Sequence, residues 1–359
     1  MSSSLASAAG AASLAILASA SIIALGAISR RWQLLSDSST KDISKLQSTL
    51  LEPLLAFSSL SVLTRDDLAA SLPFLLWPFL HVSLGLCLTF LLLPRSPRRG
   101  SLLVCAAFGN AGALPTALIP TLLSGSEVAQ AMLFVQCYLA TWRLLLWSVA
   151  PALLSNSRPK KSDDEPSAKA EDESLGGWLL RLLLPPPSVG SLLGLSLAFA
   201  PARARALLLT GPLAFLSAAA KSAGGASPPL VLVNLGYALS GVGGTRGGGG
   251  GSSSSSSAVS FTSYEVSVVV VIKLIALPAL HLLMASVLHP TDPASGLSRD
   301  QDPFHLVLLL QAAMPAAVSV QAIFHREGAD TKPLGPLMLL QYALAMPTIV
   351  VAIVLASRT

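Results

Sequence analysis

Two short stretches, one in each half of the chain, constrain its fold more than any other feature. Each places a proline, small residues and a few amides or hydroxyls inside an apolar segment, at 108–115 (FGNAGALP) and 311–319 (QAAMPAAVS). Proline removes a backbone donor and clashes with the preceding helical turn. Because a bilayer tolerates unpaired backbone groups only where protein or a water-filled cavity satisfies them, each stretch predicts a helix broken at membrane depth. A matched pair of interrupted spans is typical of a secondary transporter's binding site.

The composition favours a membrane protein. The chain is 52% hydrophobic and 11% charged, with a mean hydropathy of +0.67, whereas a soluble domain averages about 25% charged residues. The net charge of +5 could indicate nucleic-acid binding. However, the Lys and Arg residues lie mainly in short loops, where the positive-inside rule expects them. Cys87, Cys105 and Cys137 fall inside apolar segments without pair spacing, so we expect neither a disulfide framework nor a metal site.

Ten apolar segments approach the 20 or so residues that a membrane-spanning helix needs. Their approximate limits are 9–29, 46–63, 70–93, 101–123, 128–154, 178–200, 207–240, 264–288, 304–324 and 334–356. The first has an alternative interpretation as a cleaved or plastid-targeting peptide, although no basic region precedes it. The sixth and seventh are interrupted, one by prolines at 185–187 and the other by Lys221 and two glycines. We therefore predict an all-α membrane protein with ten transmembrane helices.

The predicted helices form two sets of five. A charged loop at 155–177, predicted to be cytosolic, separates a first repeat at 1–154 from a second at 178–359, which contains a flexible Gly/Ser linker at 243–257. Most basic residues lie in odd-numbered loops, which predicts that these loops are cytosolic and that both termini lie on the other side. Because five is odd, the second set enters the membrane with opposite polarity. We predict a 5+5 inverted repeat whose fourth and ninth helices are broken.

Amides within apolar segments cost free energy unless they find a partner. Gln136 and Gln341 take equivalent places in the fifth and tenth segments, which supports the repeat, and interhelical hydrogen bonding is the simpler interpretation of both. Asn110 differs, because glycines flank it and Pro115 follows. Half-helix N-termini direct positive dipole ends into such a gap, which suits a carboxylate. We predict that Asn110 contacts substrate.

Ionisable residues inside a span are functional candidates by default. Lys273 lies in the middle of the eighth segment, Glu52 precedes a proline in the second, and Arg143 lies in the fifth. We interpret Lys273 as a charge partner of Glu52 or of a substrate anion, the alternative being a side chain that extends to the membrane surface. His81 and His281 could relay protons, although a single histidine on an apolar helix is more often simply hydrogen-bonded.

Common signatures of enzymes are missing from the sequence. It contains no HExxH zinc motif, no GxSxG nucleophile elbow and no phosphate-binding GxxxxGK loop. We therefore expect a protein that is not an enzyme and that uses no metal and no cofactor. Without an ATP-binding motif, transport would be passive or driven by a gradient.

The order and spacing of these motifs resemble the auxin efflux carrier superfamily, and within it the PIN-LIKES branch. In the first half the resemblance rests on Gly26, Arg30, Arg31 and 51–58 (LEPLLAFS), and on 108–120, which is similar to that branch's Gly-Asn-x-Gly-Asn-Leu-Pro motif. In the second half, 184–190 (LPPPSVG) is similar to an Asn-Pro-Pro entry to the sixth span, and 311–319 to a Pro-x-Ala-x-Asn motif. The stretches 212–241 and 273–278 follow in the family's order.

This resemblance implies a scaffold part and a transport part, the latter containing the crossed, broken fourth and ninth spans. It also implies the endoplasmic reticulum membrane, with the plasma membrane as the alternative. Ala113 and Ser319 stand where the branch motifs have asparagine. Both positions lie at the crossover, where relatives are expected to hold a carboxylate, so these departures bear on specificity for auxin and leave the carrier scaffold unaffected.

We therefore predict a secondary carrier that moves a small, auxin-like organic anion across an intracellular membrane by alternating access. Its expected partners are that anion and membrane lipid, with no nucleic acid and with a homodimer left open. Two alternatives are a sodium- or proton-coupled carrier of a dicarboxylate or bile-acid-like anion, and a non-transporting membrane receptor. The expected substrate-binding residues, followed by two charge partners, are Asn110, Gly112, Pro115, Gln311, Pro315 and Ser319, with Lys273 and Glu52.

Overall fold

The computed structural model of the chain describes residues 2–155, 185–241, 261–288, 302–331 and 333–356. These residues are largely helical, and within them the only extended pairing is a single antiparallel bridge between Gly109 and Ala316. The all-α prediction is confirmed for this part of the chain. The predicted loop after residue 155, the Gly/Ser linker and the start of the predicted sixth span lie outside the described residues.

The first half contains two helices that change geometry or break within an apolar segment. Its elements are α1 (Ser2–Arg31), α2 (Asp37–Leu46), η1 (Gln47–Leu51), α3 (Glu52–Leu60), α4 (Arg65–Ala70), α5 (Leu72–Leu92), α6 (Arg99–Ala107), α7 (Ala113–Leu122) and α8 (Ser126–Ser155). A capping box between Thr64 and Asp67 begins α4. The elements α2, η1 and α3 follow one another without a gap and form one continuous helix. Between α6 and α7, by contrast, the chain is extended or turned.

The second half also contains a helix with a π-helical turn and a broken helix. Its elements are α10 (Pro186–Ala198), α11 (Ala202–Leu209), α12 (Ala214–Gly225), α13 (Ser227–Ser240), α14 (Ser263–Val271), η2 (Ile272–Ala276), α15 (Leu277–Leu288), α16 (Pro303–Ala313), α17 (Ser319–Arg326) and α18 (Leu334–Ala356). The prolines at 185–187 begin α10 instead of interrupting it, because the first turn of a helix needs no backbone donor there. Lys221 is exposed on α12.

The two π-helical turns, η1 and η2, each end two residues before a proline. Pro53 follows η1, and Pro278 follows η2. Proline inside a helix removes a hydrogen bond and crowds the preceding turn. A local π-helical turn widens the backbone there, and such turns are frequent at functional sites. We infer that these prolines explain why both helices continue with altered geometry.

Four helices of the described residues are long and apolar enough to cross a membrane: Leu72–Leu92, Ser126–Ser155, Ser263–Val287 and Leu334–Ile353. The pair Ala202–Leu209 and Ala214–Ser240, bent by 62°, would make a fifth if it is one span. The protein is therefore a multi-pass membrane protein. Helices α6, α7, α16 and α17 contain at most 11 residues each. Each is one piece of a broken segment, so none of them alone has the 20 or so residues that a membrane-spanning helix needs.

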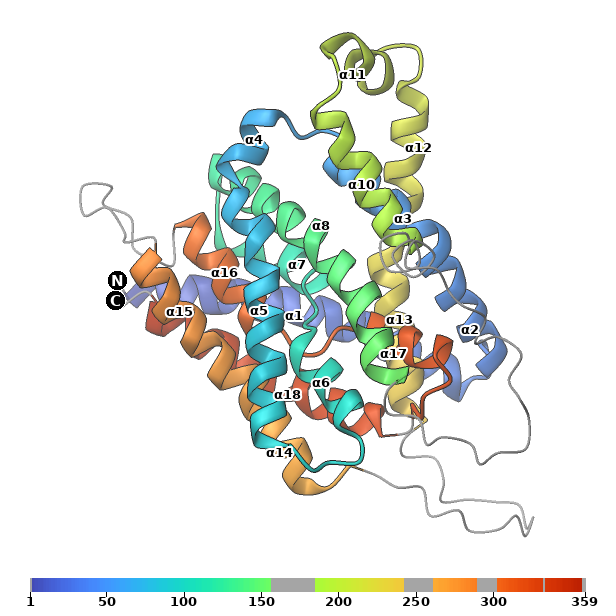
Figure 1. Cartoon of the computed structure of the whole chain (residues 1–359), viewed down its shortest axis with the longest axis vertical. Helices are drawn as coiled ribbons and strands as arrows, with labels where there is room; N and C mark the ends of the chain where they lie inside the picture. The colour runs from blue at the N-terminus through green and yellow to red at the C-terminus, as the bar shows by residue number, and fades with distance from the viewer. Residues whose placement is uncertain (1, 156–184, 242–260, 289–301, 332, 357–359) are drawn as a thin grey trace, which may run out of the picture.

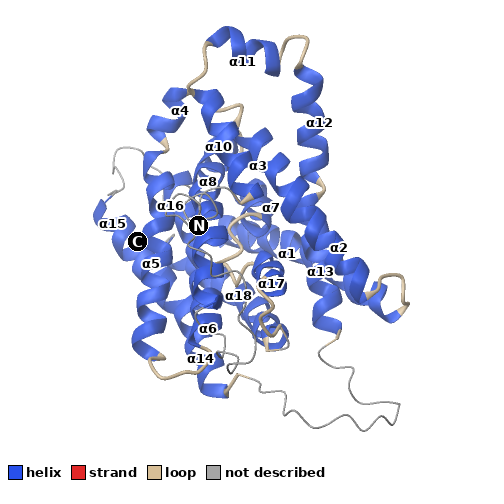
Figure 2. Ribbon diagram, turned by 45° about the vertical axis from the view of Figure 1, so that its right-hand side comes forward, coloured by secondary structure: helices blue, strands red, loops and turns tan. Residues whose placement is uncertain are grey.

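The helices divide into two groups: in both views α2 and α12 lie on the side opposite α5 and α15, while α1 passes α7 and packs on α13 (Figures 1 and 2). One group, here named the frame, consists of α1, α2, α3, α10, α12 and α13, with α1 packed on α13 and α3 packed on α10 and α12. The other group, here named the crossover group, consists of α5–α8 and α14–α18. In it, α5 packs on α6 and α8, and α16 packs on α8, α15 and α18.

Candidate functional site

The breaks between α6 and α7 and between α16 and α17 meet in the interior. The backbone N–H of Asn110 donates to the carbonyl of Pro315 at 2.7 Å, and the N–H of Ala317 donates to the carbonyl of Phe108 at 2.9 Å. These reciprocal hydrogen bonds lie on either side of the bridge between Gly109 and Ala316. Each broken helix therefore satisfies backbone groups that the other leaves unpaired, as a low-dielectric interior requires.

The two prolines at the breaks have different positions. Pro315 lies in the non-helical stretch and supplies the carbonyl that Asn110 uses. Pro115 is the third residue of α7, where a helix has no intrahelical partner for the backbone N–H in any case. Its fixed φ angle therefore suits the start of α7. Pro315 therefore lies within the break, whereas Pro115 lies in the first turn of the helix that follows the other break.

Three buried amides hold the crossed segments together. Gln311 Nε2 donates to the carbonyl of Ala111 at 3.0 Å, and Gln341 Oε1 accepts from the backbone N–H of Ala316 at 2.7 Å. Asn110 Nδ2 donates to the hydroxyl of Tyr342 at 2.9 Å. Gln341 therefore makes the interhelical hydrogen bond that was the simpler interpretation of its position. Gln311 supports the broken backbone, and it is not part of the cavity wall described next.

A cavity of about 310 Å³ lies between the frame and the crossover group. Asn110, Gly112 and Ser319, three of the predicted substrate contacts, form part of its wall, while Pro115, Gln311 and Pro315 do not. Frame residues form the other side of the wall, among them Glu52 of α3 and Val231 of α13. The cavity is therefore bounded by both groups of helices and by both breaks.

The cavity wall also contains two residues of α8 that the sequence analysis did not assign to the site. Arg143 is only 5% exposed, and its Nη1 atom is buried without a hydrogen-bond partner. Gln136 likewise has a buried, unpartnered Oε1. The presence of an arginine inside an apolar helix signalled Arg143 in the sequence, but only the packing of α8 against the breaks brings it to the cavity. An unpartnered guanidinium nitrogen provides a donor for an anion.

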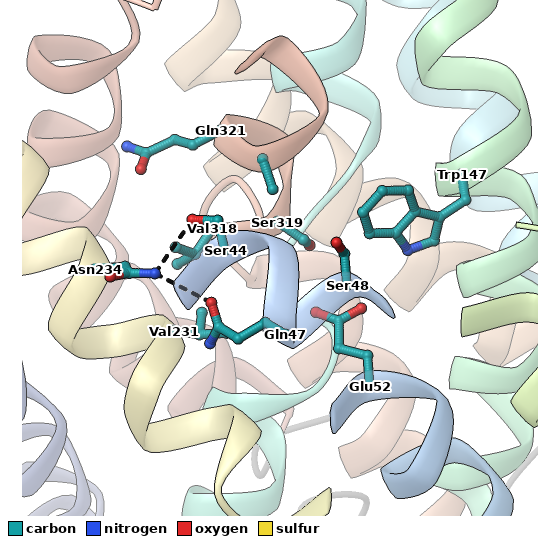
Figure 3. A pocket seen from close by; sticks show the side chains of 11 residues that line it. Ser44, Gln47, Ser48, Glu52, Trp147, Val231, Asn234, Val318, Ser319 and Gln321 are labelled. Carbon is teal, nitrogen blue, oxygen red and sulfur yellow. Dashed lines mark hydrogen bonds between the residues drawn. The ribbon is translucent and has the colours of Figure 1, made fainter. Parts of the chain in front are cut away.

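Glu52 supplies a negative charge to the same wall. It lies within electrostatic range of Arg143, yet none of the ion pairs found among the described residues joins the two side chains. Figure 3 shows Glu52 at a smaller hollow of about 20 Å³, where it points toward Ser48 and Trp147. This hollow shares Glu52, Val231, Val318 and Ser319 with the larger cavity. Glu52 and Ser319 therefore lie between the small hollow and the larger cavity.

The frame side of the small hollow is fixed by hydrogen bonds between α13 and the α2–η1 helix. Asn234 Nδ2 donates to Ser44 Oγ at 3.3 Å and to Gln47 Oε1 at 3.1 Å (Figure 3). Gln47 Nε2 in turn donates to the carbonyl of Ser227 at 3.2 Å. Because these groups bond to one another, we infer that they hold the frame together, and Glu52 is the charged residue that the frame contributes to the cavity wall.

Lys273 occupies a different place from Glu52. It is fully buried in η2, and its Nζ lies 3.3 Å from His81 Nε2 and 3.5 Å from the carbonyl of Ala107. It is absent from the cavity wall, and no ion pair among the described residues joins it to Glu52. The two charges predicted as partners are therefore separate: Glu52 lies beside Arg143 at the cavity, and Lys273 lies behind the crossover.

Comparison with known proteins places this arrangement in a family. No curated protein matches the chain. A family described as membrane transport protein matches residues 12–353, a range that contains both broken helices, the cavity and Lys273. Members of this family are transporters and not enzymes. Because the match covers nearly the whole sequence, the chain belongs to the membrane transport protein family.

Proposed function

We propose that the protein is a secondary carrier of a small, auxin-like organic anion, which it moves by alternating access. The observation that carries this proposal is the cavity in which the unpartnered Nη1 of Arg143 lies together with Asn110 of the broken fourth segment. Arginine binds carboxylates through charge-assisted hydrogen bonds, which are roughly twice as strong as neutral ones. A buried cation without a direct ion pair is therefore suited to an anionic substrate.

The cavity wall narrows the class of anion. Its volume of about 310 Å³ is at the lower end of the range usual for small-molecule sites. Leu139, Trp142 and Met132 provide apolar surface, and Arg143 and Glu52 contribute one charge of each sign. A second negative charge on the substrate would be repelled by Glu52. These features favour a monocarboxylate with an apolar or aromatic body over a dicarboxylate.

The ten-span, 5+5 inverted repeat is the architecture that we propose for this movement. One matched feature supports it: the fourth and ninth predicted segments both break, and reciprocal backbone hydrogen bonds join the two breaks. The cavity lies between the frame and the crossover group, so displacement of one group against the other would change which side it faces. We propose the frame as the scaffold and the crossover group as the transport part.

The resemblance to the PIN-LIKES branch supports the endoplasmic reticulum as the membrane in which the carrier works. In that setting the carrier would control how much of the anion is held inside the compartment, and so contribute to intracellular auxin homeostasis. Immunofluorescence of the tagged full-length chain, compared with markers of the endoplasmic reticulum and plasma membrane, would test this assignment.

Uptake of radiolabelled indole-3-acetate into proteoliposomes tests the transport proposal. We expect saturable uptake by the wild type, an initial rate at least about tenfold lower in Arg143→Gln, and partial recovery in Arg143→Lys, because a hydrogen bond to a charged group contributes about 1.5–3 kcal/mol. Arg203→Gln, which changes an exposed arginine of α11, serves as the matched control. Saturable binding without flux in sealed vesicles would instead indicate a receptor, and uptake that requires sodium would indicate a sodium-coupled carrier.

A further inference from the structure

Three basic side chains form a buried row behind the crossover. Lys273 of η2, His81 of α5 and His281 of α15 are 0%, 1% and 0% exposed. His81 Nε2 lies 3.3 Å from Lys273 Nζ, and His81 Nδ1 lies 3.3 Å from His281 Nε2. His281 Nδ1 lies 2.8 Å from the carbonyl of Leu277. The substrate cavity described above does not include these residues.

The hydrogen-bond partners determine where the protons of this row lie. The carbonyl of Leu277 can only accept, so His281 Nδ1 carries a proton, and His281 Nε2 is the acceptor of a neutral ring. His81 must then donate from Nδ1, which leaves its Nε2 to accept from Lys273 Nζ. Every ring nitrogen of His81 and His281 therefore has a hydrogen-bond partner when both histidines are neutral. Lys273, at its end, can donate to His81 either as an ammonium or as a neutral amine.

The surroundings of Lys273 provide no countercharge. The titratable groups near the row are the Cys105 thiol, which faces Lys273 from α6, and the Tyr138 ring, whose centroid lies 6.4 Å from that of His81. On neighbouring elements, Tyr342 of α18 is bonded to Asn110, and Glu265 at the start of α14 is bonded to Ser96. No carboxylate among the described residues forms an ion pair with Lys273. A buried ammonium without a countercharge is costly.

Only a short stretch of backbone, at the end of α6 and in the break that follows, separates Lys273 from the cavity. Lys273 Nζ approaches the carbonyl of Ala107 at the end of α6, where the helix dipole favours a cation. It also lies against Gly109, where an added Cβ would be only 2.9 Å from Nζ. The next residue, Asn110, is part of the cavity wall. Charges on the two sides of this backbone therefore interact through a protein interior that screens them weakly.

We propose that Lys273 binds the proton that accompanies the substrate anion, so that the anion and the proton are transported together. This rests on the proposed function. When the anion occupies the cavity, its negative charge stabilises the ammonium, and the lone pair of Lys273 Nζ takes up a proton from water on the side to which the cavity is open. When the anion leaves on the other side, the N–H bond breaks and the proton passes to water there. His81 and His281 stay neutral and position the amine.

Proton uptake on substrate binding is the first test. Indole-3-acetate is added to the weakly buffered, detergent-solubilised wild type, and the released or absorbed protons are followed with a pH indicator between pH 6 and 9. Because linkage between two ligands is reciprocal, we expect uptake that approaches about one proton per bound anion at its maximum. Absence of proton uptake over this range would overturn the proposal, as would equal uptake by Lys273→Arg, since arginine remains charged and cannot titrate there.

Flux measurements separate coupling from a structural role. Exchange of labelled for unlabelled indole-3-acetate across proteoliposomes needs only the loaded carrier, whereas net uptake also needs the empty carrier to return without its proton. We therefore expect Lys273→Arg to retain exchange within about twofold while net uptake falls at least about tenfold, a difference of about 1.4 kcal/mol or more between the two steps. Lys221→Arg, at an exposed lysine on α12, should change neither rate.

The outcomes distinguish this proposal from the proposed function. Equal losses of exchange and net uptake in Lys273→Arg would show that Lys273 only supports the crossover, and would overturn the coupling. Wild-type exchange without any proton uptake would leave the carrier intact and reject Lys273 as its proton site. Absence of exchange in the wild type, in protein shown to be folded and inserted, would overturn the proposed function itself.

Discussion

The frame and the crossover group are both built from helices, yet they are held together differently. In the frame, backbones touch: a Cβ on Gly236 would collide with the carbonyl of Ile23, and one on Gly190 with the carbonyl of Pro53. In the crossover group, buried amides such as Gln311 and Gln341 hydrogen-bond to backbone that no helix satisfies. Small residues allow close helix contacts in membranes, whereas hydrogen bonds compensate for a broken helix.

This difference indicates how each group can serve transport. Close backbone contact fixes the distance between helices, because nothing compressible lies between them, so the frame resists deformation. The crossover group contains most of the buried polar groups near the site, and their bonds are internal to that group, as those between the two breaks show. A body whose broken backbone is paired internally can move as a unit without exposing unpaired backbone groups. The cavity lies where these two kinds of packing meet.

Adding one methyl group to the frame should have the largest effect. In Gly236→Ala the new Cβ meets the backbone carbonyl of Ile23, which cannot move aside as a flexible side chain would. Overpacking typically costs about 1–3 kcal/mol and occasionally more, and here α1 and α13 must separate. We expect a large fall in the melting temperature of the purified protein, measured by differential scanning fluorimetry.

The matched control for this change is Gly225→Ala. Gly225 ends α12, and an added Cβ would meet no atom within 4 Å. Alanine is the better helix former by roughly 0.5–1 kcal/mol, so this variant should be as stable as the wild type or slightly more so. If both variants lost the same stability, close backbone contact would not be what distinguishes the frame.

Removal of a single amide should have the next largest effect on stability. Gln341→Leu leaves the buried N–H of Ala316 without its acceptor, and an orphaned buried donor costs about 1–3 kcal/mol. Gln136→Leu is the matched variant, because Gln136 Oε1 has no partner to lose. We expect a lower denaturation midpoint only in Gln341→Leu, while Gln136→Leu weakens anion binding at the cavity. Equal destabilisation by both would mean that bonds to the broken backbone do not hold the crossover group together.

Replacement of Asn110 should change binding more than stability. Asn110→Ala keeps the backbone hydrogen bond to Pro315 and removes only the side-chain amide that bonds to Tyr342 and faces the cavity. Loss of a hydrogen bond to a charged group reduces affinity by about tenfold or more. We expect this loss in isothermal titration with indole-3-acetate. Tyr342→Phe, which removes only the partner of the amide, should weaken binding less; an unchanged affinity in Asn110→Ala would place the binding site away from the crossover.

The sequence predicted the positions of both breaks because proline and small residues in an apolar run are local signals. The same logic identified Asn110, Gly112 and Ser319, which reach the cavity from the breaks themselves. The partners of Lys273 could not be predicted, because they depend on which helices lie side by side. His81 and His281 are distant in sequence, and each resembled an ordinary buried histidine when considered alone. Arg143 was recognisable as unusual, but not as a neighbour of Asn110.

Pro115 shows a second limit of prediction from sequence, which is that the position of a helix start is uncertain by about one turn. A proline in an apolar run indicates a nearby irregularity, and the local pattern does not say whether the proline lies in the break or begins the next helix. Pro315 lies in the break, whereas Pro115 lies in the first turn of α7. The prolines at 185–187 follow the second pattern and begin α10. In each case the positions of neighbouring helices, and not the proline alone, determine where the helix starts.

Replacement of Pro115 by alanine should give the smallest effect of all, and its comparison with Pro315→Ala is the finest within the crossover group. Pro115→Ala changes a residue whose missing N–H would have no intrahelical partner, so the cost should be only the gain in unfolded-chain entropy, about 0.4–1 kcal/mol. Pro315→Ala adds the same entropy and also introduces a new N–H into a buried, non-helical stretch, where an unpaired donor costs a further 1–3 kcal/mol or so. Chemical denaturation of both variants in one detergent measures the difference. Pro315→Ala should be the less stable of the two, and the reverse order would show that α7, and not the crossed backbone, depends on its proline.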